Sequence, residues 1–202
     1  MMASAAELTK SVDVATFAQF KTALEDATVT DIQLKNSLTL TASIITTKGA
    51  IKNIHGNGNL IDLKGYKVLL ADGASGLVEN ATITSASGNN YSLFYSENTS
   101  TKLVYRDINQ SGGYLPRMAG ELRLEGNITH STTGGNNSFE GRNLTIASGA
   151  NVQLTNPTSG AYSSIDMNAT YGPSTLLIEK GGLSEYRYSC YHLVWNMVIP
   201  RE

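Results

Sequence analysis

Arginine and aspartate are the residue types that come closest to a catalytic pattern in this 202-residue chain. A polysaccharide lyase removes a sugar proton with arginine or lysine, and grouped aspartates hold the calcium ion that acidifies this proton. Arg117 lies beside a proline in YLPRM, but position 120, where the lyase pattern R-x-P-x-x-R has its second arginine, is Gly. We therefore expect no catalytic residue and interpret Arg117 as an exposed loop arginine. The possible calcium ligands are scattered singly: Asp62, Asp72, Asp107 and Asp166.

Other catalytic arrangements also lack their residues. Glycosidases need carboxylates close together around the scissile bond, and the chain has neither an Asp-Asp pair nor an N-x-D motif. No G-x-S-x-G, P-loop or H-E-x-x-H motif occurs. The histidines are each better explained as turn, strand-end or tail residues than as bases: His55, His130 and His192.

Tyrosines give the strongest sequence signal for binding. They concentrate between residues 91 and 114, where a row of rings on one sheet could stack on sugars while the hydroxyl groups bond outward. The alternative is that these rings fill the core or thicken a loop. With the nearby arginine, the candidate ligand-binding residues are Tyr91, Tyr95, Tyr105, Tyr114 and Arg117.

Composition narrows the class of protein and its partners. The hydrophobic fraction is 41% and the charged fraction is 16%, which is typical of one folded domain. A net charge of −2 without a basic block disfavours binding to nucleic acid. The single Cys190 excludes an internal disulfide and a Cys/His zinc site, so we expect no cofactor or metal. The start of the chain does not resemble a signal peptide, and no apolar run predicts membrane insertion.

One helix and many short strands are expected to position these side chains. Thr16 and Gln19 form a capping-box pattern that opens a helix over about 16–27. An alternating segment over 31–40 then predicts a half-buried strand, and only strand patterns follow Gly49. The further strands are expected at 51–54, 60–63, 67–70, 77–84, 103–109, 121–129, 142–147, 151–155 and 175–179.

The strands recur at the spacing of a repeat protein. The apolar residues Ile61, Ile83, Ile108 and Ile128 lie 22, 25 and 20 residues apart, and glycine-asparagine turns such as GNGN at 56–59 separate the strands. A stacked β-solenoid capped by the helix accounts for this order. A β-sandwich, which also has many short strands, is the alternative.

The helix, the strand after it and the stretch NIHGNGNLIDL at 53–63 resemble the start of the pectate-lyase-like adhesive domain of Gram-positive surface proteins. The likeness continues through ELRLEGNIT at 121–129 and FEG at 139–141. It implies an all-β fold, a right-handed parallel β-helix, in a non-catalytic module for adhesion or scaffolding. The partner would be a host or bacterial surface glycan or protein. The location would be extracellular, at the bacterial cell surface or cell wall.

Three segments are expected along the chain. Residues 1–11 would be disordered or left over from cloning, 12–188 would form the β-helix, and 189–202 would be an atypical tail that either caps the last turn or marks a truncation. Because an uncapped solenoid end offers unpaired strand edges, self-association through the C-terminal end is a further prediction. A polysaccharide lyase or glycoside hydrolase of the same architecture, and a purely structural stalk, remain the alternatives to adhesion.

Overall fold

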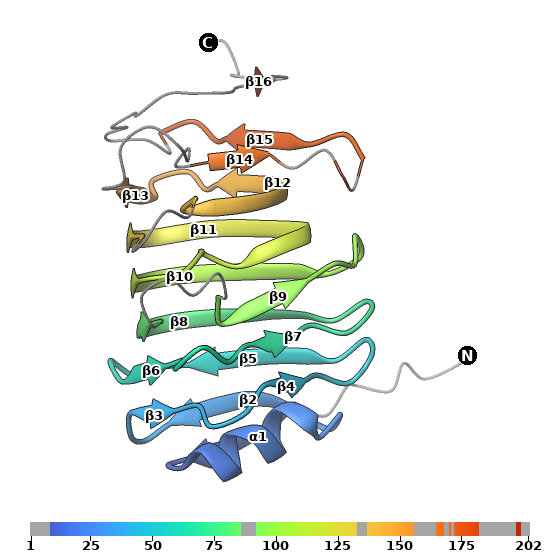
Figure 1. Cartoon of the computed structure of the whole chain (residues 1–202), viewed down its shortest axis with the longest axis vertical. Coiled ribbons are helices and arrows are strands. Elements are labelled where there is room, and N and C mark those ends of the chain that lie inside the picture. Colours follow the sequence, from blue (N-terminus) through green and yellow to red (C-terminus); the bar gives the residue numbers. More distant parts are fainter. Residues whose placement is uncertain are drawn as a thin grey trace, which may run out of the picture.

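The computed structural model describes residues 9–85, 92–132, 137–155, 165–167, 170, 172–181 and 197–198. Its described part is a parallel β-solenoid of about six turns with one short helix at the N-terminal end (Figure 1). Every strand pair among the described residues is parallel, and the strands of one turn pair with those of the next. The predicted parallel β-helix with its capping helix is therefore confirmed, and the β-sandwich is excluded.

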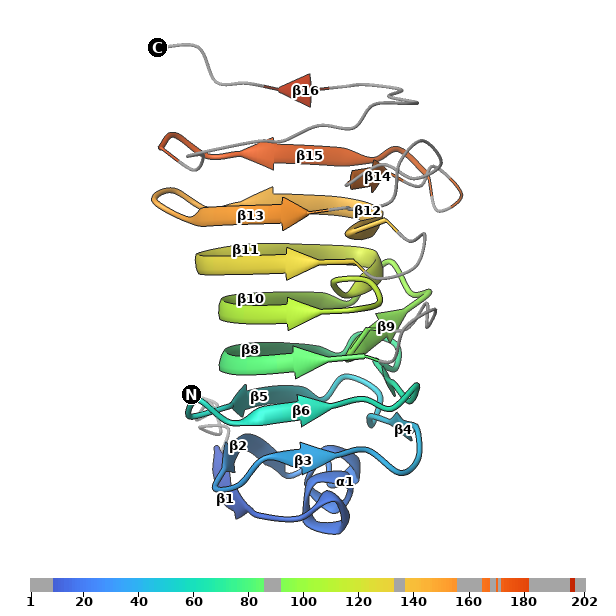
Figure 2. The same ribbon diagram turned by 60° about the vertical axis from the view of Figure 1, so that its left-hand side comes forward.

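The strands stack in three columns, which we call the first, second and third sheets (Figures 1 and 2). Several long strands bend from one sheet into another. The first sheet contains β1 (Lys10–Val14), β2 (Val29–Leu34), β5 (Ile51–His55), β8 (Ser75–Thr84), β10 (Lys102–Ser111), β11 (Arg117–Ser131), β12 (Phe139–Ile146), β15 (Thr175–Ile178) and β16 (Met197–Val198). The second adds β3 (Leu38–Thr39), β6 (Leu60–Asp62) and β13 (Asn151–Thr155), and the third adds β4 (Ile44–Ile45), β7 (Val68–Leu69), β9 (Phe94–Ser96) and β14 (Ile165–Met167).

The helix α1 (Phe17–Glu25) closes the N-terminal end of the core. Thr16 accepts a hydrogen bond from the backbone N–H of Gln19, and the Gln19 side chain accepts one from the Thr16 N–H, so the predicted capping box is present. Phe20, Ala23 and Leu24 are buried beneath it. The helix thus covers apolar side chains that the first turns would otherwise expose to water.

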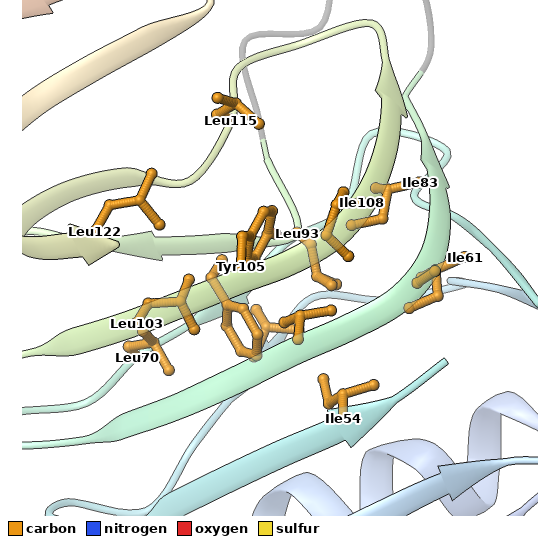
Figure 3. Close-up of a cluster of buried hydrophobic side chains, with 14 of the residues drawn as sticks. Ile54, Ile61, Leu70, Ile83, Leu93, Leu103, Tyr105, Ile108, Leu115 and Leu122 are labelled. Carbon is orange, nitrogen blue, oxygen red and sulfur yellow. The ribbon is translucent and has the colours of Figure 1, made fainter. Parts of the chain in front are cut away.

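Side chains alternate between the core and the outer face because strand residues have a period of two. Residues of successive turns lie in register on the core side of the first sheet, and all of them are inaccessible to water. Figure 3 shows the ring of Tyr105 among aliphatic side chains. This column consists of Ile32, Ile54, Val78, Tyr105, Leu124 and Ile146.

The regularly spaced isoleucines are all buried, but they do not form one column: Ile61, Ile83, Ile108 and Ile128. Ile61 stacks on Ile83, and Ile108 stacks on Ile128. Ile83, however, lies opposite Gln110 rather than Ile108. The interval of 25 residues therefore joins two neighbouring columns, and only the intervals of 22 and 20 residues measure a turn.

The corners between the first and second sheets use residues that tolerate a left-handed backbone. Asn57, Asn80, Asp107 and Gly126 have φ angles of 54°, 48°, 52° and 62°. Asparagine, aspartate and glycine adopt this conformation at the lowest cost. The predicted corner and strand at 52–63 correspond to β5, a turn and β6.

Two boundaries differ from the predictions. β1 begins at Lys10, inside the segment expected to be disordered, because residues 11–14 pair in parallel with β2. The strand expected at 31–40 is two strands, β2 and β3, since the chain changes sheets between them. Two residues of the tail segment form β16, which pairs in parallel with β15 and extends the first sheet.

Candidate functional site

The outer face of the first sheet carries a chain of alternating charges. The inward positions of these strands are mostly apolar, and the outward positions include the charged side chains that pair across the turns. Parallel register brings residues from different turns to about 4.8 Å spacing, although they are far apart in sequence. We call this chain the charge ladder; it consists of Asp31, His55, Glu79, Arg106, Glu125, Arg123 and Glu179.

The lower half of the charge ladder is centred on His55. Its Nε2 lies 3.1 Å from Asp31 Oδ1 and its Nδ1 lies 2.6 Å from Glu79 Oε1. The other oxygen of Glu79 accepts a 3.0 Å bond from Arg106. Burial disfavours the charged imidazole, but the bonds to the two carboxylates outweigh it and raise the pKa of His55.

The upper half is held by two arginines. Arg106 donates to Glu125 at 3.0 and 2.7 Å, and Arg123 donates to the other Glu125 oxygen at 2.8 Å. Arg123 also donates to both oxygens of Glu179, at 2.6 and 3.0 Å. This guanidinium, followed by the Ser148 N–H, lowers the pKa of Glu179 to about 2. Bidentate arginine–carboxylate contacts of this kind fix side-chain geometry.

A shallow groove lies beside the charge ladder on the same face. Its volume is about 340 Å³, and it spans β5, β8, β10 and β11. The floor includes Ile51, Leu77 and Val104; Leu77 and Val104 are half-buried, while Ile51 is 39% exposed. Lys102 and Arg123 also line it. The groove therefore combines an apolar floor that a partner can desolvate with charged groups that can orient that partner.

Tyr105 is not part of any outer surface. It is fully buried, lies in register between Val78 and Leu124, and burial raises the pKa of its hydroxyl. The expectation that it contacts a ligand is therefore corrected. The alternation of LVY at 103–105 contains the signal, since Leu103 and Tyr105 are both buried; the left-handed Asp107 then moves the next buried position to Ile108.

Tyr95 and Arg117 meet on the third sheet. They are register partners of β9 and β11, and the guanidinium carbon of Arg117 lies 5.6 Å from the ring centre of Tyr95. The ammonium of Lys67 lies 4.3 Å from the same ring centre, and the Tyr95 hydroxyl donates to Glu97. Only 9% of Tyr95 is exposed. The protein's own cations therefore approach this ring in the way that a cationic ligand would.

The remaining candidates have different surroundings. Arg117 was expected to be an exposed loop residue, but it is half-buried at the start of β11. Its guanidinium forms a 2.6 Å ion pair with Glu140. Tyr114 is buried, and its backbone carbonyl accepts a bond from Gln110. Tyr91 lies outside the described residues. The structure thus brings Tyr95 and Arg117 together on the third sheet and separates them from the groove on the first.

The histidines have separate surroundings in the part of the chain that the structure describes. His55 belongs to the charge ladder, His130 is buried in the second sheet, and His192 lies outside the described residues. Within the described part of the chain, no three His, Cys, Asp or Glu side chains gather as they would to hold a metal ion. None of the described helices is long and apolar enough to span a membrane.

Solved structures share this fold. The L. reuteri 53608 SRRP aligns with a TM-score of 0.64 and 23% identity, covering 82% of this chain and 67% of its own. The L. reuteri 100-23 SRRP aligns with a TM-score of 0.69 and 23% identity, covering 84% of this chain and 59% of its own. At this identity the likeness concerns the fold. The chain spans about three fifths to two thirds of the length of these two chains.

Sequence comparison gives the family. No curated protein matches the chain significantly. A family model matches residues 11–115, which is more than half of the chain and covers the capping helix, the groove strands β5, β8 and β10, and part of the charge ladder. Its description is a pectate lyase-like adhesive domain. This chain therefore belongs to the pectate lyase-like adhesive domain family.

Proposed function

We propose that this adhesion module is displayed outside a bacterial cell and binds its partner through the groove and the charge ladder of the first sheet. The partner is a surface glycan or protein. The observation that carries the proposal is the combination on one face of half-buried aliphatic side chains with ordered ionic contacts. Apolar contacts at the centre of an interface supply affinity, and surrounding charges supply orientation.

The first sheet is a suitable binding surface because it is held in place by its neighbours. The strands that carry the groove pair on both edges, β5 with β2 and β8, and β10 with β8 and β11. A partner therefore meets side chains that are already ordered. This lowers the conformational entropy that binding costs.

The groove is tested by placing a charge on its floor. Leu77→Asp should weaken binding to a surface ligand, identified on a glycan array or an extracellular-matrix protein panel, by at least about tenfold. Ile45→Asp is the matched control because Ile45 is 62% exposed on the third sheet. Both variants should keep the unfolding temperature of the parent chain. Equal binding by the Leu77 variant would refute the groove as the adhesive site.

A purely structural stalk and a polysaccharide lyase are the two alternatives to adhesion, and each predicts a different measurement. A purely structural stalk gives no saturable ligand in the same screens. A polysaccharide lyase releases unsaturated product from polygalacturonate in the presence of calcium, and that absorbance would overturn the non-catalytic proposal. We expect none. Arg117 would be the first residue to substitute if product appeared.

The third sheet offers a second test surface. Tyr95 and Arg117 remain candidates for ligand contact there, with Arg117 half-buried and paired with Glu140. Arg117→Ala should leave binding unchanged if the groove is the adhesive site. Self-association through the C-terminal end is a separate prediction. A chain that lacks residues 189–202 should keep its folded turns but associate more in light scattering, and an unchanged monomer would contradict this.

A further inference from the structure

The outward side chains of β5, β8, β10 and β11 have a sign pattern that reverses from turn to turn. His55, Glu79, Arg106 and Glu125 are successive register partners along the stack. The first and third of these donate to the second and fourth. The donors and the carboxylates therefore alternate at the spacing of the strands.

A parallel column beside it contains the floor of the groove. Its members are also successive register partners: Asn53, Leu77, Val104 and Arg123. The two aliphatic residues occupy the middle two strands, and the polar residues occupy the outer two. The column is thus apolar at its centre and polar at both ends.

These two columns are complementary to themselves under one rotation. The two-fold axis lies in the plane where two such faces meet. It runs parallel to the strands and passes midway between β8 and β10. The rotation places β8 opposite β10 of a second copy and β5 opposite β11. Glu79 then faces Arg106 of the second copy, and His55 faces its Glu125. At the centre, Leu77 faces Val104 of the second copy.

We propose that this face docks on the same face of a second copy of the chain, with the two solenoid axes antiparallel, so that adhesion by this module is homophilic. The proposal rests on the proposed function, since it uses the groove already described. A two-fold axis along the solenoid would instead place each strand at the level of its own counterpart. That arrangement sets donors level with donors and carboxylates level with carboxylates, which costs affinity.

The nature of the groove also favours a protein partner over a sugar. None of the described residues that line it is aromatic, whereas stacked rings are the usual platform for sugars. Aliphatic side chains on a second sheet can fill an aliphatic floor when two sheets pack face to face. At the margin the match is weaker, because Ile51 would face Glu121. The decisive substitutions therefore belong at the centre.

Two double variants test the register directly. Leu77→Glu with Val104→Lys places opposite charges across both symmetry-related contacts, while Leu77→Glu with Val104→Glu places like charges there. In sedimentation of the full chain over a concentration series, the parent should form dimers. The Glu/Lys variant should keep the dimer, and the Glu/Glu variant should weaken it by at least about tenfold. Ile45→Glu on the third sheet should have no effect.

The outcomes separate the two proposals. A parent chain that stays monomeric, or a dimer that the Glu/Glu variant leaves intact, overturns homophilic docking. If Leu77→Asp still abolishes binding to another surface ligand in that case, the groove keeps its adhesive function. If the Glu/Glu variant unfolds, Leu77→Ser with Val104→Ser takes its place. This variant adds no charge and should also weaken the dimer. Beads coated with the parent chain should aggregate, and beads coated with the Glu/Glu variant should not.

Discussion

The ammonium nitrogen of Lys52 lies 2.6 Å from the backbone carbonyl oxygen of Asp26, the C-cap residue that follows α1. The same nitrogen donates to the carbonyl oxygens of Ala23, at 2.9 Å, and Val29, at 2.6 Å. Lys52 points inward from β5 and is fully buried. One side chain of the second turn thus binds the carbonyl groups of Ala23 and Asp26 at the end of the capping helix and that of Val29 at the start of β2.

Lys52→Met should destabilise the chain by about 3 kcal/mol, because it leaves buried carbonyl groups without their donor. Lys35→Met is the control, since the Lys35 side chain is 52% exposed and its ion pair with Asp13 is worth little. Urea unfolding followed by circular dichroism measures both. A Lys52 variant as stable as the control would show that the helix end is satisfied in another way.

Gly76→Ala should cost more than about 3 kcal/mol because it forces two strands apart. A Cβ at Gly76 would lie 2.1 Å from the carbonyl oxygen of Lys52 on the adjacent strand. Gly58→Ala is the comparison: its φ of +78° strains an alanine, but no atom lies within 4 Å of the new Cβ. That variant should lose about 1 kcal/mol. Thermal unfolding of the two proteins should rank them in this order.

His130 makes the stack sensitive to acid. Burial lowers its pKa to about 4, against smaller opposing contributions from Gly113 and Gly112, while the unfolded value is 6.5. Between these values the unfolded chain binds a proton that the folded chain does not, so stability falls as the pH drops from 6.5 to 4. The loss should approach about 3 kcal/mol. His130→Leu should flatten the pH dependence of urea unfolding in this window, and an unchanged slope would contradict the assignment.

His55 should have the opposite pH dependence. Its pKa is raised by Asp31 and Glu79 against the cost of burial, so its contribution is complete below pH 6.5 and disappears as the pH rises through the folded value. His55→Gln should therefore cost about 1 kcal/mol at pH 6 and less at pH 9. Urea unfolding at the two pH values measures this difference, and a cost that grows with pH would be the contrary result.

Local patterns were sufficient for several elements. The capping box of α1 rests on Thr16 and Gln19, which lie within one helical turn, and the strand at 151–155 follows from alternation within five residues. The left-handed corner at Asn57 follows from the glycine-asparagine turn at 56–59, whereas Asn80, Asp107 and Gly126 form corners inside segments that were expected to be continuous strands. The capping box, the strand at 151–155 and the corner at Asn57 depend on neighbours in sequence, so the residue types alone predict them.

The short strands of the third sheet were predicted less well. β4 and β14 were not anticipated, and β9 lies among tyrosines that suggested a binding row. Strands of two or three residues carry no measurable period. Tyr105 was misassigned because a tyrosine suits either an exposed platform or a core, and the decision depends on which face of the sheet its position occupies.

The amino-acid sequence by itself determined the stacked β architecture, the capping helix and the resemblance to an adhesive family, because strand alternation, turn residues and caps are local properties. Only the tertiary structure decided which outward side chains form the charge ladder and the groove. Arg106 bonds to Glu125, 19 residues ahead, and to Glu79, 27 residues behind. Since turns differ in length, the contacts across the stack follow from backbone register, and no fixed sequence spacing encodes them.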